Sequence, residues 1–525
     1  MCFINMEQQQ YKSSNKRIAK NTLYMYFRMA ILMLVSLYTS RVVLANLGID
    51  DYGIYNVVGA LIVSFTFIKG PLSSATQRFL NFEMGVKTNG RPNLVFNVSL
   101  YVYIVIAVLL VLVLEIGGLW FLNNQMNIPN GRMSATQFTF QVSLISLLFS
   151  FARVPYDALI ITNERLSFYA LLSLLEVTLK LLNAFSLSYF MVDKLELYAI
   201  NHLAIDIIIT STFITYTKVK IPEFKFTGEW DGKIARSLLK FTGWGLFGSF
   251  TAMTADEGVT IIINIFCGVF VNASMGIAQQ INNAICGLAS NFQTAFRPQI
   301  MKSYASGDWQ DMNTLIERTS KFSFLLIFLI AFPFSLNCEF ILDLWLKEWP
   351  PLARDFCIFF MGYSLINVLG APFWMAIYAT GNIRNYQLLY SCISLLNIVF
   401  SYIFLLFGVS PCSVLIVKIL LEVAILTTRI ELVRRYVNFV PSIYSKKVLL
   451  PCTFVLLLSS LLIIPFCFLI GIGWIRLIVT LMLFVILYPF LIYYICLSSS
   501  ERKYVLEKLS MITTVPLKWT NRSLK

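Results

Sequence analysis

Histidine and charge are both scarce in this chain of 525 residues, which has one histidine and only 13% charged residues. Soluble domains carry about 25% charged residues, and zinc sites and acid–base catalysts usually draw on histidine. The ten cysteines are scattered and form no C-x-x-C motif, so neither a metal site nor a disulfide framework is expected. Most of these cysteines are expected to be small apolar residues inside helices.

Hydrophobic sequence, by contrast, is abundant: 58% of the residues are hydrophobic and the mean hydropathy is +0.73. Apolar runs of about 20 residues, the length that crosses a bilayer, recur along almost the whole chain. The predicted fold class is an all-α polytopic membrane protein with about 14 transmembrane helices. The expected helices cover residues 22–47, 53–80, 94–119, 134–162, 167–190, 196–217, 235–265, 272–300, 319–343, 354–380, 385–407, 409–436, 446–470 and 473–497.

Lysine and arginine predict the orientation of these helices, because they collect in cytoplasmic loops. The polar breaks between the predicted helices form two alternating sets. One set is rich in lysine and arginine, whereas the other set holds little beyond Arg132, Lys194, Lys347 and Arg354. Both termini are therefore predicted to be cytoplasmic. The net charge of +14 follows mostly from this bias and from attraction to anionic lipid headgroups, so nucleic acid is not an expected partner. The rich breaks contain Lys12, Lys16, Arg17, Lys20, Lys87, Arg91, Arg165, Lys218, Lys220, Lys225, Lys233, Arg236, Lys240, Lys302, Arg318, Lys321, Arg384, Arg429, Arg434, Arg435, Lys446 and Lys447.

A weak internal repeat divides the chain into two halves. Gly53-Ile54 aligns with Gly276-Ile277, and Arg78 aligns with Arg297, at an offset of about 220 residues that spans six helices. An even number of helices gives both copies the same orientation, so the repeat is parallel. The predicted organisation is a cytoplasmic N-terminus (1–21), an N-lobe (22–217, helices 1–6), a cytoplasmic linker (218–234), a C-lobe (235–436, helices 7–12), helices 13–14 (446–497) and a basic cytoplasmic tail (498–525).

Polar and charged residues form stripes on four of the predicted helices. Isolated amides and hydroxyls commonly join membrane helices by hydrogen bonds, and arginines near helix ends can reach the interface. Ionisable residues inside spans, in contrast, usually face a water-filled path or a charged partner. Glu176–Lys180 and Lys418–Glu422 have the spacing of structural ion pairs, as does Arg153–Asp157. The stripes contain Arg28 and Arg41 (helix 1), Thr66, Lys69, Ser73, Thr76 and Arg78 (helix 2), Asp256 and Glu257 (helix 7), and Gln279, Asn283 and Arg297 (helix 8).

Three stretches resemble the polysaccharide flippases of capsule and O-antigen gene clusters, especially those of Bacteroides-like bacteria. They are "LVSLYTSRVVLANLGIDDYGIYNVVGA", "SSATQRFLNFEMG" and "NIFCGVFVNASMGIAQQINNAICGLASNFQTAFRPQIMKSY". These flippases belong to the multidrug/oligosaccharidyl-lipid/polysaccharide exporter superfamily. The resemblance covers essentially the whole chain and implies two six-helix lobes in a V-shape plus two extra C-terminal helices. It also implies a cavity lined mainly by helices 1, 2, 7 and 8, and flipping of undecaprenyl-diphosphate-linked oligosaccharide units across a bacterial inner membrane by alternating access.

This cargo gives the polar stripes candidate roles. Lys69, Arg78, Arg28, Arg41 and Arg297 are predicted to offset the charge of the diphosphate, while Ser73, Thr76, Gln279 and Asn283 replace water around the sugar. Pro71, after Gly70, predicts a bend or break in the second helix beside Lys69.

Carboxylates would repel the diphosphate, so Asp256 and Glu257 are predicted to form a coupling site for a proton or Na+. No other cofactor is expected. Two departures from the family pattern are Met275, where members often carry arginine, and the charged pair Asp256-Glu257 itself. Helices 13 and 14 are candidates for a groove that holds the isoprenoid.

Two other transporters and an enzyme are the alternatives. A multidrug or organic-cation antiporter should have a net acidic, aromatic cavity, and a peptidoglycan-precursor flippase is separated from the favoured function by resemblance alone. An enzyme would need a large loop or a cluster of catalytic carboxylates and histidines, so no enzyme is expected. The expected partners are the lipid-linked oligosaccharide and membrane lipids, and other polysaccharide-assembly proteins are further candidates.

Overall fold

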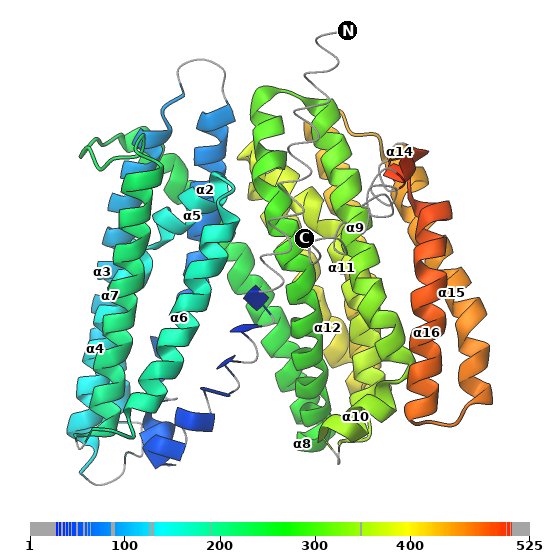
Figure 1. Cartoon of the computed structure of the whole chain (residues 1–525), viewed down its shortest axis with the longest axis horizontal. Coiled ribbons are helices and arrows are strands. Elements are labelled where there is room, and N and C mark those ends of the chain that lie inside the picture. Colours follow the sequence, from blue (N-terminus) through cyan, green and yellow to red (C-terminus); the bar gives the residue numbers. More distant parts are fainter. Residues whose placement is uncertain are drawn as a thin grey trace, which may run out of the picture.

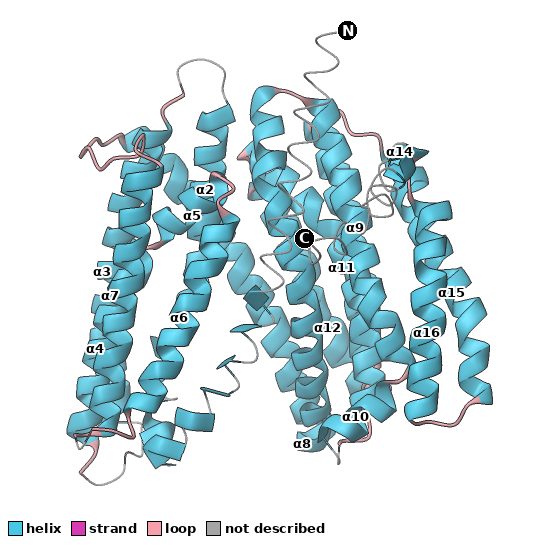
Figure 2. Ribbon diagram, viewed as in Figure 1, coloured by secondary structure: helices cyan, strands magenta, loops and turns pink. Residues whose placement is uncertain are grey.

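A computed structural model of the chain describes residues 28–29, 31–32, 35–36, 38–39, 41–43, 45–48, 51–55, 58–59, 61–62, 65–85, 90–124, 128, 131–190, 192–346, 349–499, 501–503 and 506. These residues are almost entirely helical and contain no strand (Figure 2). Ten of the described helices are long and apolar enough to cross a membrane. The predicted all-α polytopic membrane protein is confirmed. The predicted N-terminus and most of the basic tail lie outside the described residues.

The first half of the chain forms one helical bundle (Figure 1). Its first two helices are described in part, by helical residues between 28 and 48 and between 51 and 62. The remaining elements are the 3-10 turn η1 (Thr66–Ile68), α2 (Lys69–Gly85), α3 (Pro92–Asn124), α4 (Met133–Ala152), α5 (Val154–Thr162), α6 (Leu166–Ser186) and α7 (Lys194–Lys220).

The second half forms a second bundle, beside which the last two long helices stand (Figure 1). Both α15 and α16 pack against α9, on the side away from the first bundle. The elements are α8 (Gly232–Ser306), α9 (Trp309–Leu336), α10 (Cys338–Leu346), α11 (Ala353–Thr380), α12 (Arg384–Leu406), α13 (Ser413–Tyr436), α14 (Pro441–Tyr444), the π-helix η2 (Ser445–Leu449), α15 (Leu450–Leu469), α16 (Trp474–Leu491) and the π-helix η3 (Ile492–Cys496).

Glycine and proline set the breaks within these helices. Gly268 has φ 78° and ψ −178°, a conformation that favours glycine, and it divides α8 where the sequence predicts two separate helices. The predicted break beside Lys69 is present as η1, because Pro71 cannot donate the backbone hydrogen bond to the preceding turn. A second proline, Pro155, divides the predicted helix 134–162 into α4 and α5 at Arg153, a break that the sequence analysis did not predict.

Successive helices run in opposite directions, so their turns alternate between two ends of the molecule. We call the end with the turns 163–165, 221–231, 307–308, 381–383 and 437–440 the basic end, because the arginine- and lysine-rich breaks lie there. The opposite end carries the turns 131–132, 187–190 with 192–193, 349–352, 407–412 and 470–473. The compartment that each end faces stays a prediction.

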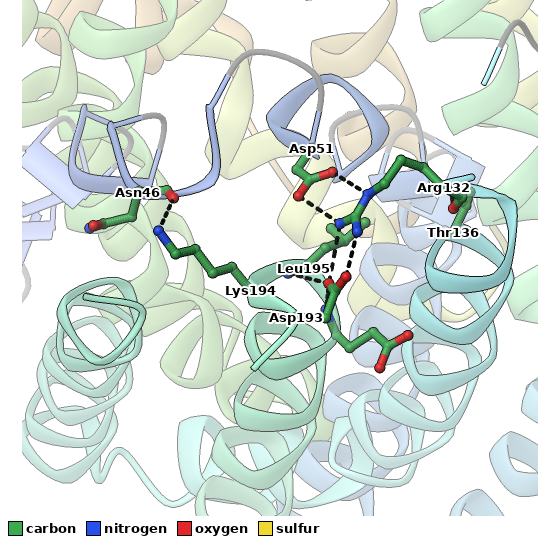
Figure 3. Close-up of polar contacts among 8 residues, drawn as sticks. Asn46, Asp51, Arg132, Thr136, Asp193, Lys194 and Leu195 are labelled. Atoms are coloured by element: carbon green, nitrogen blue, oxygen red, sulfur yellow. Dashed lines mark hydrogen bonds and ion pairs between the residues drawn. The ribbon is translucent and has the colours of Figure 1, made fainter. Parts of the chain in front are cut away.

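An ionic clasp ties three segments of the N-lobe together at the opposite end (Figure 3). Arg132 donates to both Asp51 oxygens, at 2.8 and 2.6 Å, and also to Asp193. Asp193 in turn accepts hydrogen bonds from the backbone N–H groups of Leu195 and Glu196 and so caps the start of α7. The clasp therefore fixes the start of α7 against the first residue of the second helix and the turn before α4.

The two lobes pack together mainly through α2 and α8, near the basic end. A Cβ atom at Gly245 would lie 3.2 Å from Pro71, and one at Gly85 would lie 2.6 Å from the Ala305 side chain, so both glycines allow close approach of the helices. The rings of Phe79 and Phe241 meet edge to face, with centroids 6.2 Å apart. These contacts close the lobes against each other at the basic end.

Candidate functional site

A cavity of about 270 Å³ lies inside the N-lobe, between helix 1, the junction of α4 and α5, α6 and α7. Its lining is strongly charged for the interior of a membrane protein. Such groups need partners, because an unpaired charge in a low-dielectric interior is costly. The polar lining residues are Arg28, Arg153, Asp157, Tyr169, Ser173, Glu176 and Lys180.

Ion pairs link most of these charges across helices. Glu176 accepts from Lys180 at 2.8 Å, which confirms the predicted pair within α6, and also from Arg153 at 3.5 Å. Arg153 lies 3.9 Å from Asp157, one helical turn away. The Oδ1 atom of Asp157 is buried and has no hydrogen-bond partner among the described residues. The site therefore keeps one acceptor that an incoming cation or donor could use.

Lys69 belongs to this charged interior. It is the first residue of α2, and its Nζ atom lies 5.4 Å from the centre of the Phe151 ring on α4. Its ammonium interacts electrostatically with Arg153, Asp157, Glu176 and Asp206. Lys69 is thus turned into the N-lobe, and the break at η1 places it there.

Arg28 joins the same region from helix 1. Its guanidinium carbon lies 4.9 Å from the centre of the Tyr169 ring, a cation–π distance, and its Nε atom is buried without a hydrogen-bond partner among the described residues. Arg28 and Arg153 therefore line the N-lobe cavity, whereas Lys69 is not a lining residue and contacts Phe151, two residues before Arg153.

Two further predicted cations lie where α2 and α8 meet the last turns of α11. Arg78 donates from Nη2 to the carbonyl oxygen of Thr380 at 3.4 Å, at the helix end where the dipole attracts cations. Gly381 makes this contact possible: its φ is 77°, and a Cβ atom there would lie 2.3 Å from Arg78. The guanidinium carbon of Arg297 lies 5.1 Å from the centre of the Trp374 ring.

These two arginines are short of partners. The Nε and Nη2 atoms of Arg297 and the Nε atom of Arg78 are buried without a hydrogen-bond partner among the described residues. Within the described part of the chain, neither the Arg78 nor the Arg297 guanidinium lies within ion-pair distance of a carboxylate. Arg78, which reaches from α2 to α11 across the lobe interface, and Arg297 within the C-lobe therefore keep buried N–H groups without a hydrogen-bond partner among the described residues.

The C-lobe contains its own ionic network, with different partners from those predicted. Lys418 donates to Asp256 at 2.7 Å, whereas Glu422 lies 3.5 Å from Arg429. The predicted Lys418–Glu422 pair is therefore wrong, because each side chain reaches a different neighbour. Asn367 on α11 also donates to Glu422, at 3.1 Å, and so helps to hold this carboxylate away from Lys418.

Arg429 is the residue that the sequence analysis misplaced. It was expected in a basic break together with Arg434 and Arg435, but it is only 6% exposed and its Nε atom donates to the Tyr386 hydroxyl at 3.1 Å. Arg429 follows Glu422 by seven residues, which is two helical turns. This spacing is the sequence feature that could have indicated the pair between them.

The remaining predicted site residues are dispersed. Ser73 accepts a hydrogen bond from Gln77 at 2.9 Å, and Thr76 is fully buried and hydrogen-bonded to Tyr103. Gln279 is half-buried. Arg41, Glu257 and Asn283 are exposed, as is Asp256, whose side chain is 53% exposed despite its ion pair. Of the predicted site residues, the N-lobe cavity is lined by Arg28, and the roles of the others stay predictions.

Comparison with known proteins identifies the fold. No known family model matches the chain. A curated relative, the uncharacterized membrane protein EpsK of Bacillus subtilis (strain 168), is 18% identical over 339 residues, which are 64% of this chain and 67% of that protein.

Several solved transporter structures are similar along most of their length. A mutant MATE protein matches with a TM-score of 0.70 and 12% identity over 79% of this chain and 95% of its own. A MOP superfamily transporter from Pyrococcus furiosus, described as having a binding pocket of reverse polarity, matches with a TM-score of 0.68 and 13% identity. The match covers 81% of this chain and 96% of that transporter. An outward-facing multidrug resistance MATE transporter matches with a TM-score of 0.67 and 13% identity, over 81% of this chain and 96% of that transporter. This chain therefore has the fold of the MATE and MOP superfamily transporters.

Proposed function

We propose that this chain is a transporter that flips undecaprenyl-diphosphate-linked oligosaccharide units from the cytoplasmic to the periplasmic leaflet by alternating access. The fold supports a transporter, and the sequence resemblance to polysaccharide flippases supports this cargo. The observation that carries the proposal is that Arg78 and Arg297, which both contact the last turns of α11, have buried N–H groups without a partner among the described residues.

A diphosphate fits these groups better than an organic cation does. Guanidinium groups bind phosphate oxygens through paired N–H donors, and each such charge-assisted bond contributes about 1.5–3 kcal/mol. Trp374 beside Arg297 adds an apolar wall that limits competition from water. An organic cation at the same place would be repelled by both arginines.

The arrangement of the lobes also suits alternating access. The described contacts between α2 and α8 lie near the basic end, and each lobe is held together by its own ion pairs. Opening at the basic end would separate the two phenylalanines and the glycine contacts between the lobes while leaving these pairs intact.

Asp256 and Glu257 remain the proposed coupling site for a proton or Na+. Because Lys418 donates to Asp256 at 2.7 Å, a coupling cation would compete with the lysine ammonium for this carboxylate. A cation that binds more tightly where the Asp256–Lys418 contact is weaker would favour that conformation.

An organic-cation antiporter is the second candidate. The observation in its favour is the N-lobe cavity, where Asp157 has an unpartnered carboxylate oxygen and Tyr169 supplies an aromatic wall. Lys180, Arg28 and Arg153 also line this cavity and would repel an organic cation, which argues against this second function.

Binding to the purified protein would distinguish the candidates. The probes are undecaprenyl diphosphate without sugar and the organic cation tetraphenylphosphonium. We expect tighter binding of the diphosphate, and we expect Arg297→Gln to weaken that binding about 10- to 100-fold, the loss of one charged hydrogen-bonding group. Arg434→Gln, which removes an exposed arginine, is the matched control and should bind normally. Tighter binding of tetraphenylphosphonium, together with no effect of Arg297→Gln, would overturn the proposal.

The cellular test is deletion of the gene in its host. The proposal expects loss of a surface polysaccharide and accumulation of its lipid-linked unit on the cytoplasmic side. Accumulation of peptidoglycan precursor in its place would favour the related flippase of that pathway.

A further inference from the structure

The ammonium group of Lys418 is enclosed by side chains from two other helices of the C-lobe. Lys418 lies in the second turn of α13, and its side chain is only 14% exposed. Its Nζ atom donates to Asp256 on α8 at 2.7 Å, and it lies 4.8 and 5.3 Å from the centres of the Tyr363 and Phe360 rings on α11. Aromatic ring faces attract cations, and a carboxylate forms a strong charge-assisted hydrogen bond with an ammonium. These contacts form a binding place for a cation, and the protein fills it with its own lysine.

The second carboxylate of this network has a different cation as its partner. Glu422 lies one turn after Lys418 on α13. Its Oε1 atom accepts from Asn367 at 3.1 Å and lies 3.5 Å from Nη1 of Arg429. Each of the two carboxylates is therefore paired with one cation, and the four charges cancel. A free metal ion at Asp256 would add a third positive charge to this balanced set, which is unfavourable inside a membrane protein.

We propose that Lys418 is the resident cation of this site and that it sets the ion selectivity of Asp256 by excluding Na+. Because the ammonium is attached to α13, its effective concentration at Asp256 is fixed by the fold and does not depend on the ions in solution. A free Na+ would have to shed water and approach an ammonium that is already bonded to the same carboxylate. Of the two ions proposed for coupling, Na+ is thereby excluded at Asp256. This inference rests on the proposed coupling site and not on the identity of the cargo.

Removal of the lysine charge should convert the same place into a Na+ site. The side chain of Asp256 is 53% exposed, so water and ions can reach its carboxylate. Glutamine at position 418 would put a neutral amide oxygen close to where the ammonium stands. Hard cations bind carboxylate, amide and water oxygens, and the variant would offer all three.

Thermal unfolding of the purified full chain in detergent tests the proposal, with NaCl replacing KCl at constant ionic strength. The wild type should have the same Tm in both salts. The Tm of Lys418→Gln should rise by about 3–6 °C between Na+-free buffer and Na+ at ten times its Kd, for a lobe of about 200 residues. Adding Asp256→Asn to Lys418→Gln should abolish this rise.

Two further variants control for the loss of a lysine. Lys418→Arg keeps the positive charge, so its Tm should be the same in both salts. Lys447→Gln removes a lysine that pairs with Glu317 but is 62% exposed, and it should also respond like the wild type.

Two results would overturn the proposal. The first is a wild-type Tm that rises with Na+ and no longer does so in Asp256→Asn, because Na+ would then bind in spite of the lysine. This measurement stands even if Lys418→Gln folds poorly. The second is a folded Lys418→Gln whose Tm is the same in both salts, because its carboxylate would then not be a Na+ site. The lipid-linked cargo is absent from the experiment, so the outcome is independent of the binding test with undecaprenyl diphosphate.

Discussion

The ionic clasp of the N-lobe offers a quantitative test of the structure. Replacing Arg132 by glutamine removes its hydrogen bonds to Asp51 and Asp193 and leaves two carboxylates close together (Figure 3). The side chains of Arg132, Asp51 and Asp193 are 27%, 18% and 29% exposed, so the clasp is half-buried. Exposed ion pairs contribute about 0.2–1 kcal/mol and hydrogen bonds to charged groups about 1.5–3 kcal/mol, so we expect Arg132→Gln to destabilise the N-lobe by about 1–3 kcal/mol.

Thermal unfolding of the purified protein in detergent would measure this loss. A domain of 150–250 residues loses about 2–4 °C in Tm per kcal/mol, so we expect a decrease of about 2–12 °C at pH 7. Arg434→Gln is the control: it removes an arginine that pairs with Glu431 but is 61% exposed, and its Tm should equal that of the wild type.

The difference between wild type and Arg132→Gln should also depend on pH in a defined direction. The hydrogen bond from Arg132 holds the pKa of Asp193 below its ordinary value of 3.8. A carboxylate with a depressed pKa in the folded state stabilises the protein above the unfolded pKa, and this contribution is lost as the pH falls through the folded value. The Tm difference should therefore be constant from pH 8 to 5 and shrink below about pH 4. An unchanged Tm at pH 7, or a difference that grows on acidification, would refute the reasoning.

Three other substitutions test the charged sites. Lys69→Met should abolish rescue of polysaccharide export in a deletion strain at normal expression, and full rescue would remove Lys69 from the site. Asp256→Asn should leave Lys418 without its ion-pair partner and change the dependence of transport on the proton or Na+ gradient; an unchanged dependence in vesicles would eliminate the coupling site. Lys302→Gln removes a 3.4 Å contact with Glu164 at the basic end and should shift the lobes toward opening there by about 0.2–1 kcal/mol, measured as faster labelling of an engineered interface cysteine. A slower rate of labelling would contradict it.

The breaks in the helices were predictable where a single residue decides them. Pro71 and Gly268 act on their own backbone, so the break before Lys69 and the division of α8 follow from the local sequence. Pro155 has the same effect, but the apolar run around it is continuous and hydropathy alone does not reveal the division into α4 and α5.

The partners of the buried charges were predictable only within one helix. Glu176 and Lys180 are one turn apart and pair as their spacing predicts. Lys418 and Glu422 have the same spacing, yet Lys418 binds Asp256, which is 162 residues away along the chain. The choice between a neighbour one turn away and a carboxylate on another helix depends on helix packing, and no pattern in the sequence contains that information.

The distribution of ion pairs has a consequence for the motion that alternating access requires. The pairs Arg153–Glu176 and Asp256–Lys418 each join helices of the same lobe, whereas Glu164 and Lys302 join the two lobes. Lobes that move as rigid bodies keep the pairs within each lobe and, of these three, break only the pair between Glu164 and Lys302. The side chain of Lys302 is 31% exposed, so this pair contributes about 1 kcal/mol or less. The electrostatic part of the barrier should therefore be small, and most of the resistance to opening at the basic end should come from apolar contacts such as Phe79 with Phe241.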